Sequence, residues 1–486
     1  MLFNSYEFIF VFLPISFFIY FYLNSLKKFK EAKLFLLFAS LFFYSWWNVA
    51  YLPLILGSMV FNYIVGTKLS DIKHNDNNYK RILLTFGIIS NIFLLGYFKY
   101  SDFFIENINF LTGENIPLLH LALPLAISFF TFQQIAYLVD SYRGETREYD
   151  FLNYAVFVTF FPQLIAGPIV HHKEMMPQFE DIKTKYINYK NIALGLSIFA
   201  LGLFKKVAIA DTLSVYANEG FDLSTELKFI EAWVTSLSYT FQLYFDFSGY
   251  TDMAIGAALL FNIKLPINFN SPYKAVNIQD FWRRWHITLS RFLRDYVYIP
   301  LGGSKKGDLL TYRNLFLTFL IGGIWHGAGW TFVVWGALHG IAMVIHRIWS
   351  RFKIKMNRFL AWFITFNFVN IAWVFFRAKD FEDALKVLKG MFALDGVILP
   401  YSLSEKFAFL ADYGIEFNRI MPNIDAGKEV ILMLFAVGAV ALFAKNSYEF
   451  LINFKPKRVY LVFTSFLLAV AILKLNQISE FLYFNF

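Results

Sequence analysis

The sequence predicts an all-α polytopic integral membrane protein. Of its 486 residues, 58% are hydrophobic and only 16% are charged, whereas a soluble domain carries about a quarter of charged residues. Apolar runs close to the roughly 20 residues that cross a bilayer as a helix recur from one end of the chain to the other. One soluble core could not bury that much apolar surface, so the composition excludes a soluble globular protein.

The apolar runs define the expected helices. They lie at residues 6–23, 34–47, 52–65, 82–98, 118–139, 151–170, 192–204, 232–247, 253–263, 315–348, 360–376, 430–443 and 459–475. Several are too short to span alone, so we expect about 11 to 14 crossings mixed with re-entrant pieces. The first run has no basic region before it and no cleavage site behind it, and is expected to stay as a membrane helix. Residues 1–486 are expected to form a single membrane domain.

The net charge of +9 is explained by basic loops at the membrane surface and does not indicate nucleic-acid binding. Basic residues gather in short connections, at 27–33, 283–294, 347–358 and 454–458, and short basic loops face the cytoplasm. The N-terminus is therefore predicted outside, and residues 380–428 form the longest extracytoplasmic loop. The stretch "LFKKVAIAD" and the loop 173–190 do not fit this scheme if both are cytoplasmic. The absence of cysteine excludes disulfides and thiolate chemistry.

Four polar clusters interrupt the apolar runs, and ionisable residues at membrane depth are functional candidates. The first, "FFPQLIAGPIVHH" at 160–172, holds two prolines and a glycine, which cannot continue a regular helix. It is predicted as either a kinked helix end or the wall of a cavity. Its neighbouring histidines, His171 and His172, would point about 100° apart on a helix and make a poor metal pair.

The second cluster is "FQLYFDFSGYTDMAIG" at 241–256, where Gly249 is expected to break the helix. Its two carboxylates, Asp246 and Asp252, are either a paired acid and base or helix caps. Asp252 suits a cap for a helix that starts at about Thr251. Asp246 stands among large aromatic residues, so a functional role is favoured for it.

The third cluster is "NIQDFWRRWHITLSRFLRDYVYIPLGG" at 277–303, which is predicted as one amphipathic helix at the cytoplasmic interface. Helical spacing places Trp282, His286, Leu289 and Leu293 on one face, and Arg284, Thr288, Arg291 and Asp295 on another. The arginines would bind either lipid headgroups or the phosphates of a cytoplasmic cofactor. His286, on the apolar face, is either a packing residue or a functional one.

The fourth cluster is "GGIWHGAGWTFVVWGALHG", in which two glycines precede His326 and two follow it. They predict a break at the apex of a helical hairpin, with both ends inside. A buried neutral histidine can take a proton from a hydroxyl and return it to a leaving group, although it can equally serve packing alone. His339 lies about 220° further around a continuous helix, and His346 is two turns beyond it. A metal site is therefore not expected.

At these residues the chain resembles the membrane-bound O-acyltransferase family, in its bacterial branch of alginate O-acetylation, peptidoglycan O-acetylation and teichoic-acid D-alanyl transfer. The matching stretches run in family order between about 126 and 340, the expected motif-bearing core. They are "FFTFQQIAYLVDSYRGE", "FFPQLIAGPIV", "LFKKVAIAD", "FDFSGYTDMAIGAALLFNIKLPINFNSPY", "DFWRRWHITLSRFLRDYVYIPLGG" and "GIWHGAGWTFVVWGALHG". The resemblance implies a ring of helices around a central tunnel, His326 as the catalytic histidine and His286 as a second essential one.

The expected mechanism follows from this resemblance. Acetyl-coenzyme A would dock on the cytoplasmic face, and His326 would deprotonate an acceptor hydroxyl that is presented from outside. The predicted donor-binding residues are Arg283, Arg284, Arg291, Arg294 and Trp282. The predicted supporting residues are Trp325, Trp285, Asp246, Ser248 and Tyr250, of which Ser248, Tyr250 or a tryptophan indole would donate to the oxyanion. No metal and no tightly bound cofactor are expected.

The resemblance also implies that the protein lies in the inner membrane of a bacterium, and that an exported partner accepts the acetyl group. The heavy use of Phe, Ile, Asn and Lys indicates AT-rich coding, which favours peptidoglycan or another surface glycan over an alginate-like exopolysaccharide. D-alanyl transfer from a carrier protein to teichoic acid is the nearest alternative. A lipid-linked glycan flippase is an alternative of another class, although transporters often show two related halves and no such pairing is evident here.

Overall fold

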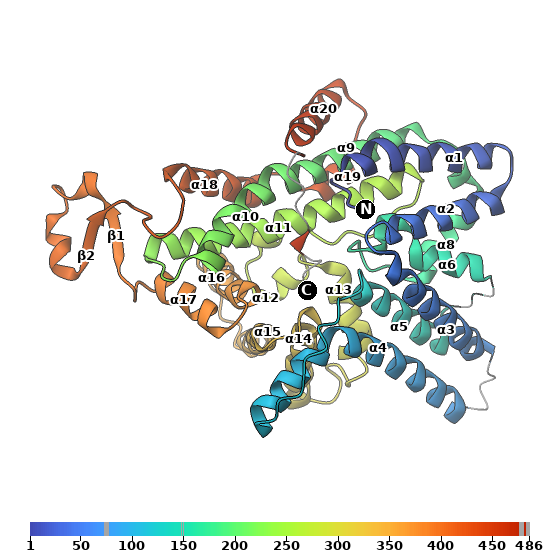
Figure 1. Cartoon of the computed structure of the whole chain (residues 1–486), viewed down its shortest axis with the longest axis horizontal. Helices are drawn as coiled ribbons and strands as arrows, with labels where there is room; N and C mark the ends of the chain where they lie inside the picture. Colours follow the sequence, from blue (N-terminus) through green and yellow to red (C-terminus); the bar gives the residue numbers. More distant parts are fainter. Residues whose placement is uncertain (72–76, 147, 149, 476–480, 483–486) are drawn as a thin grey trace. The chain divides into compact units, whose positions relative to one another are not determined.

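A computed structural model of the chain describes residues 1–71, 77–146, 148, 150–475 and 481–482. Almost all of its regular structure is helical, and the two strands are four residues long each. The predicted all-α class is therefore confirmed (Figure 1). The contacts divide the chain into two compact units, and the expected single domain stays a prediction.

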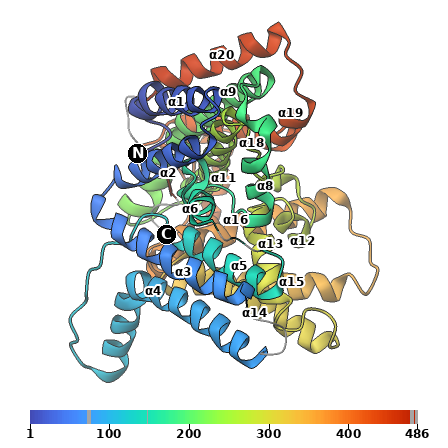
Figure 2. The same cartoon turned by 90° about the vertical axis from the view of Figure 1, so that its right-hand side faces the viewer.

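The first unit is built from residues 1–204, 249–268 and 447–486. Its helices are α1 (Leu13–Ser25), α2 (Phe29–Ser45), α3 (Leu52–Asp71), α4 (Asn77–Thr112), α5 (Ile127–Arg143), α6 (Phe151–Thr159), α7 (Phe161–Leu164), α8 (His172–Glu180), α9 (Tyr189–Phe204), α19 (Ser447–Asn453) and α20 (Arg458–Leu473). Helices α3, α4 and α5 lie side by side (Figure 2). Helix α20 packs on α9, although they are far apart in the sequence.

The second unit is built from residues 205–248 and 269–446. Its elements are α10 (Asp211–Asn218), α12 (Ile278–Trp282), α13 (Ile287–Leu293), α14 (Asp308–His326), α15 (Trp330–Trp349), α16 (Arg358–Arg377), α17 (Phe381–Met391), β1 (Val397–Pro400), β2 (Ile415–Asn418) and α18 (Lys428–Phe443). Helix α11 (Phe229–Leu260) contributes its first part to this unit and its last part to the other. Helices α14 and α15 pack along each other, and α16 covers α15.

Within the described residues, six helices are long and apolar enough to cross a membrane. They span Glu7–Ser25, Val49–Asp71, Asn77–Thr112, Tyr189–Leu223, Trp330–Trp349 and Arg358–Arg377, and the bent pair α18 and α19 would make a seventh. This count is below the expected 11 to 14 because many apolar runs form short broken helices, such as α6 and α7, or carry polar residues, as α14 does. The protein is polytopic, as predicted.

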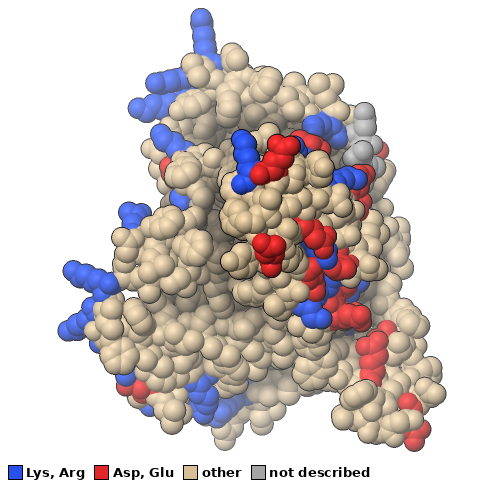
Figure 3. Space-filling view, turned by 90° about the vertical axis from the view of Figure 1, so that its left-hand side faces the viewer, with Lys and Arg blue, Asp and Glu red and all other residues tan. Residues whose placement is uncertain are grey.

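The helix surfaces fit a hydrocarbon environment. Large apolar side chains stand exposed on them, among them Phe93 on α4, Phe435 on α18 and Phe466 on α20. Uncharged residues cover most of the face drawn in Figure 3, where acidic and basic side chains gather in limited areas. Exposed apolar surface on this scale needs lipid or protein to cover it.

Two sequence predictions about elements are wrong. Gly249 does not break a helix and no helix begins at Thr251, because α11 continues through both positions. The "LFKKVAIAD" stretch, which the sequence left unassigned, is helical, since a π-helical segment at Lys205–Ala210 continues one helix over Tyr189–Leu223.

The expected loop at 380–428 is an ordered module. It contains α17 and a small parallel sheet in which Val397 of β1 pairs with Ile415 of β2. It packs on the rest of the second unit through buried Ala384, Val387 and Met391 of α17, and Lys386 Nζ donates to the carbonyl oxygens of Phe221 at 2.9 Å and Ser224 at 2.8 Å. Its extracytoplasmic side stays a prediction.

Candidate active site

The loop that carries His326 joins α14 to α15 in a tight hairpin. Helix α14 ends at His326, and α15 begins at Trp330 after three residues of broken backbone. The two helices approach closely because Gly336 has no side chain, since a Cβ there would lie 2.7 Å from the carbonyl oxygen of Phe319. The predicted break and hairpin are confirmed, and the glycines produce both.

The His326 ring is buried between aromatic side chains and is only 7% exposed. The edge of its ring meets Trp335 at a centroid distance of 5.1 Å and Phe376 at 5.2 Å. These neighbours come from α15 and α16, not from the adjoining positions in the sequence. Trp325, a predicted supporting residue, is half-buried, and Trp330 is 54% exposed.

His339 is a member of this site that the sequence did not indicate. The break before α15 makes the angle on a continuous helix irrelevant, and the Trp335 ring lies against both His326 and His339, 4.8 Å from the latter. The indole Nε1–H of Trp282 donates to His339 Nδ1 at 3.2 Å. An indole nitrogen can only donate, so Nδ1 must be the acceptor and Nε2 carries the proton. The i, i+4 spacing of Trp335 and His339 was the available signal.

The segment 277–303 is not the single amphipathic helix that its spacing predicts. It folds as α12, a turn, α13 and a π-helical segment at Arg294–Tyr298. The turn forms because the carbonyl of Arg284 accepts a hydrogen bond from the Asn270 amide at 2.9 Å, which comes from outside the segment. His286 then takes a left-handed conformation with φ of 41° and begins α13.

As a result His286 does not lie on a membrane-facing stripe with Trp282. It is 2% exposed, and its ring meets the edge of Phe247 at 4.8 Å. Burial lowers its pKa to about 3, so it is neutral near pH 7. The adjacent Trp285 stacks on Phe281 at 5.7 Å and contacts Trp373 at 5.0 Å, which in turn stacks on Trp335.

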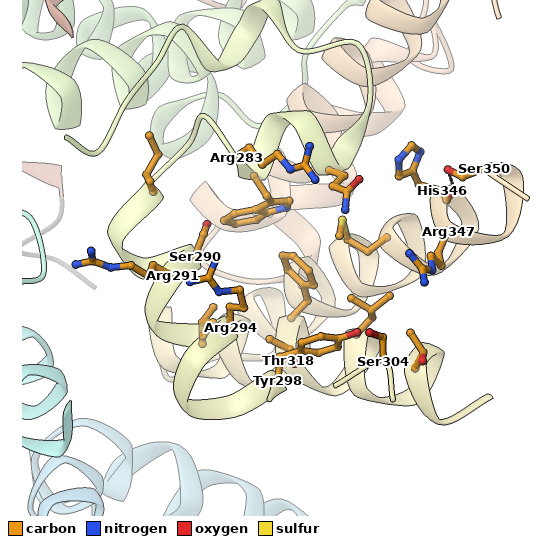
Figure 4. Close-up of a pocket in the computed structure, with 18 residues that line it drawn as sticks. Arg283, Ser290, Arg291, Arg294, Tyr298, Ser304, Thr318, His346, Arg347 and Ser350 are labelled. Carbon is orange, nitrogen blue, oxygen red and sulfur yellow. Dashed lines mark hydrogen bonds between the residues drawn. The ribbon is translucent and has the colours of Figure 1, made fainter. Parts of the chain in front are cut away.

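A basic pocket of about 630 Å³ opens beside this aromatic cluster (Figure 4). Three predicted donor-binding arginines line it with Trp282: Arg283, Arg291 and Arg294. The last turns of α15 add His346 and Arg347, which the sequence did not indicate, and no acidic residue is among those that line the pocket. Arg284 lies outside its lining, where Nε pairs with Asp280 at 2.8 Å.

Asp246 forms a buried ion pair. Its carboxylate accepts from Lys206 Nζ at 2.6 Å, and the same amine lies 2.9 Å from Asp211. Both partners come from "LFKKVAIAD", so this motif supplies a cation that balances Asp246. A buried carboxylate needs such a partner, which gives Asp246 a structural reason to be where it is.

The other residues of the second cluster separate. Ser248 is buried in the second unit, and no hydrogen-bond partner for its hydroxyl is found in the described part of the chain. Tyr250 lies in the first unit, where its hydroxyl accepts from the Ala166 amide at 3.3 Å. Asp252, also there, accepts from the Ser447 hydroxyl and does not cap a helix. Asp246 and Asp252 therefore have different partners.

The first cluster is broken backbone inside the first unit, as its prolines predict. Helices α6, α7 and α8 follow one another in short pieces, and all of residues 160–172 are buried. His171 lies 3.5 Å from Asp140, while His172 lies 3.1 Å from Glu148, so the two rings have separate carboxylate partners. No group of three or more metal-ligating side chains is found among the residues that the structure describes.

Comparison with known proteins agrees with the motifs. The family model of membrane-bound O-acyltransferases matches residues 48–379. The chain is 54% identical to the peptidoglycan O-acetyltransferase of Helicobacter pylori, over 100% of this chain and 98% of that protein. It is 42% identical to the probable alginate O-acetylase AlgI of Pseudomonas aeruginosa, over 81% of this chain and 75% of that protein. It is 30% identical to the teichoic acid D-alanyltransferase of Bacillus subtilis, over 53% of this chain and 69% of that protein.

The family match covers most of the chain and includes both helices of the His326 hairpin, the broken segment at 277–303 and the Lys206–Asp246 pair. The chain is an O-acyltransferase of many membrane helices, and it belongs to the membrane-bound O-acyltransferase family.

Proposed function

We propose that this chain moves an acetyl group from acetyl-coenzyme A, on the cytoplasmic side of a bacterial inner membrane, toward peptidoglycan outside. The observation that carries the proposal is the position of Trp282. Its ring lines the basic pocket and also contacts Trp335 at 5.8 Å, and Trp335 contacts His326. A donor held in the pocket would thus have its reactive end next to the His326 cluster.

The pocket suits a phosphorylated thioester. Its lining carries Arg283, Arg291, Arg294 and Arg347 without an acidic side chain, although Asp295 pairs with Arg294 from just outside the lining at 2.7 Å. Guanidinium groups bind phosphate oxygens through paired hydrogen bonds. Apolar side chains, including Leu293, Phe319 and Met343, also line the pocket and offer a surface to the uncharged arm of the donor.

His326 acts in this proposal as the general base for the acceptor hydroxyl. Its burial among Trp335 and Phe376 keeps water from the acyl group, which favours transfer over hydrolysis. His286 stays the predicted second essential histidine, and its neutral ring would serve in positioning. The acceptor side is reached from outside, where an exported partner takes the acetyl group; the N-terminus lies on that side as well.

The choice of glycan rests on the near full-length similarity to a peptidoglycan O-acetyltransferase. D-alanyl transfer is the second candidate, because the teichoic acid enzyme is similar over about half of this chain. A flippase is the third, and differs from both in forming no ester.

The first experiment compares the O-acetyl content of purified peptidoglycan and exported glycans from cells that carry wild type or His326→Ala at equal membrane abundance. We expect ester to be lost from peptidoglycan alone. Loss of D-alanyl ester from teichoic acid would transfer the proposal to the second candidate. Ester content that His326→Ala leaves unchanged everywhere would overturn the acyl-transfer role of His326.

A further inference from the structure

Of three buried hydrogen-bond donors near His326 that have no acceptor in the described part of the chain, one is the indole N–H of Trp373 on α16 and two lie together on α15. The two on α15 are the indole Nε1–H of Trp335 and the Nε2 of His339, in side chains that are 2% and 0% exposed. Their rings lie 4.8 Å apart on one face of α15. Buried polar groups are nearly always paired, so two orphans in contact indicate a missing binding partner.

The chemistry of that partner follows from the hydrogen bond that Trp282 donates to His339 Nδ1. It fixes the neutral tautomer in which Nε2 bears hydrogen, so both orphans are N–H groups and neither can accept. The surrounding rings, Phe281, Phe319 and Phe368, offer no lone pair of their own. A site with donors only takes a group with lone pairs only, which is a carbonyl oxygen or an oxyanion.

The location connects the donors to the reaction. Trp335 also meets the edge of His326 at 5.1 Å, and Trp282, which holds the tautomer of His339, lines the basic pocket. The rings that carry the two N–H groups therefore lie between Trp282, which lines the pocket proposed for the thioester, and the proposed base. An oxyanion site built from two N–H donors is the common solution in acyl transfer.

We propose that the N–H groups of Trp335 and His339, here called the donor pair, bind the acyl oxygen of the thioester and its oxyanion. This inference rests on the proposed function. His326 takes the proton of the acceptor hydroxyl as its oxygen bonds to the acyl carbon, and the carbonyl π electrons move to the acyl oxygen under the donor pair. When the tetrahedral species collapses, the C–S bond breaks, and the thiolate takes the proton back from the imidazolium. An ester and a free thiol result.

The test removes one N–H at a time from the full-length protein in membrane vesicles. Trp335→Phe deletes the first donor. His339→Asn removes the N–H at the position of Nε2, because the asparagine side chain is too short to reach it, and keeps an oxygen that can accept from Trp282. The matched control is Trp362→Phe, because the Trp362 indole already donates to the Tyr273 carbonyl at 2.9 Å. Acetyl-coenzyme A is varied in vesicles that retain the exported partner, with soluble peptidoglycan fragments as the final acceptor, and thiol release and ester formation are both followed.

Each donor-pair variant is expected to lower kcat about 100-fold with KM for acetyl-coenzyme A unchanged, since the donors act on charge that develops only during the reaction. The control keeps its kcat. If kcat of both variants equals that of the control, or if KM rises at constant kcat, the inference is wrong. Either of these outcomes leaves the proposed function intact as long as His326→Ala abolishes ester formation. Ester formation by His326→Ala would contradict both the inference and the proposed function.

A variant that folds poorly is replaced by an isostere. Benzothienylalanine, which has sulfur in place of the indole N–H, is introduced at the position of Trp335, so shape is kept and only the donor is lost. The expected result is the same fall in kcat with the thermal unfolding midpoint of wild type. A purely structural tryptophan would give wild-type kcat with this residue.

Discussion

At the scale of single residues, three buried histidines of the second unit have different surroundings. His339 has its tautomer fixed by Trp282 at 3.2 Å. His286 is buried against Phe247 and directly precedes a helix in a left-handed conformation. His326 stands at a helix end against Trp335 and Phe376. In the proposed mechanism, identical side chains therefore serve as an oriented donor, a neutral positioning group and a base.

The burial of His286 predicts a pH dependence of stability. Its pKa is about 3 in the folded protein and about 6.5 when unfolded, so between these values the unfolded state binds more protons. The contribution of His286 to the free energy of unfolding is therefore fully present above about pH 6.5. It falls as the pH falls, and about 2 kcal/mol of it is lost at pH 5.

The measurement is the thermal unfolding midpoint in detergent at pH 7, 6 and 5. We expect the wild-type midpoint to fall faster with acidification than that of His286→Gln, which has no imidazole to protonate in the unfolded state. Parallel curves for the two proteins would show that the His286 ring is accessible to protons in the folded state.

Which site residues a sequence reveals depends on how unusual they are in their surroundings. His326 stands out because glycines surround it in an apolar run, and Arg283, Arg291 and Arg294 because arginine is rare in such a chain. His339 carries no such mark, since its importance comes from a hydrogen bond to Trp282, 57 positions away.

At the scale of elements, the α14–α15 hairpin depends on contact between backbones. A Cβ at Gly336 would lie 2.7 Å from a backbone oxygen of the facing helix, whereas nothing lies within 4 Å of one at Gly96 in α4. Both glycines are inside helices, so alanine raises the helical propensity of each by about 1 kcal/mol. Only Gly336→Ala has to separate two helices.

We therefore expect Gly96→Ala to keep or raise the thermal unfolding midpoint, and Gly336→Ala to lower it and to reduce ester formation through displacement of Trp335. Both are measured on the full-length protein in detergent. Equal midpoints for the two variants would mean that the hairpin can widen at no cost.

The helix at 277–303 shows why element boundaries could not all be predicted. Its apolar spacing satisfied the helical period, and no glycine or proline before Pro300 marked a break. The break comes from Asn270, whose backbone N–H donates a hydrogen bond to the carbonyl oxygen of Arg284. A hydrogen bond from outside the segment leaves no periodic trace within it, whereas the break at His326 was predicted because its glycines are local.

At the scale of the whole molecule, part of the net charge of +9 is concentrated at the basic pocket. Arg347, at the end of α15, lines the basic pocket, whereas the exposed Arg351 pairs with Asp308 and is not among the residues that line it. If the pocket binds phosphates, loss of Arg347 weakens the binding of acetyl-coenzyme A equally in the ground state and in the transition state.

Arg347→Ala is expected to raise KM for acetyl-coenzyme A about 10-fold with kcat unchanged, the effect of one charge-assisted hydrogen bond. Arg351→Ala serves as the control and should leave KM as in wild type. Initial rates in membrane vesicles provide both constants. A rise of equal size in the two variants would indicate a general loss of surface charge and no phosphate site.

The division of the chain into two units has a consequence for its biosynthesis. The first unit takes residues from both ends of the sequence, and its α9 is covered by α20. A ribosome releases α9 long before α20, so the apolar face of α9 must wait in the bilayer, against lipid or the insertion machinery, until nearly the whole chain has been translated. Helix α20 thus completes a unit that begins far earlier in the sequence, and a stop codon before α20 would leave α9 uncovered.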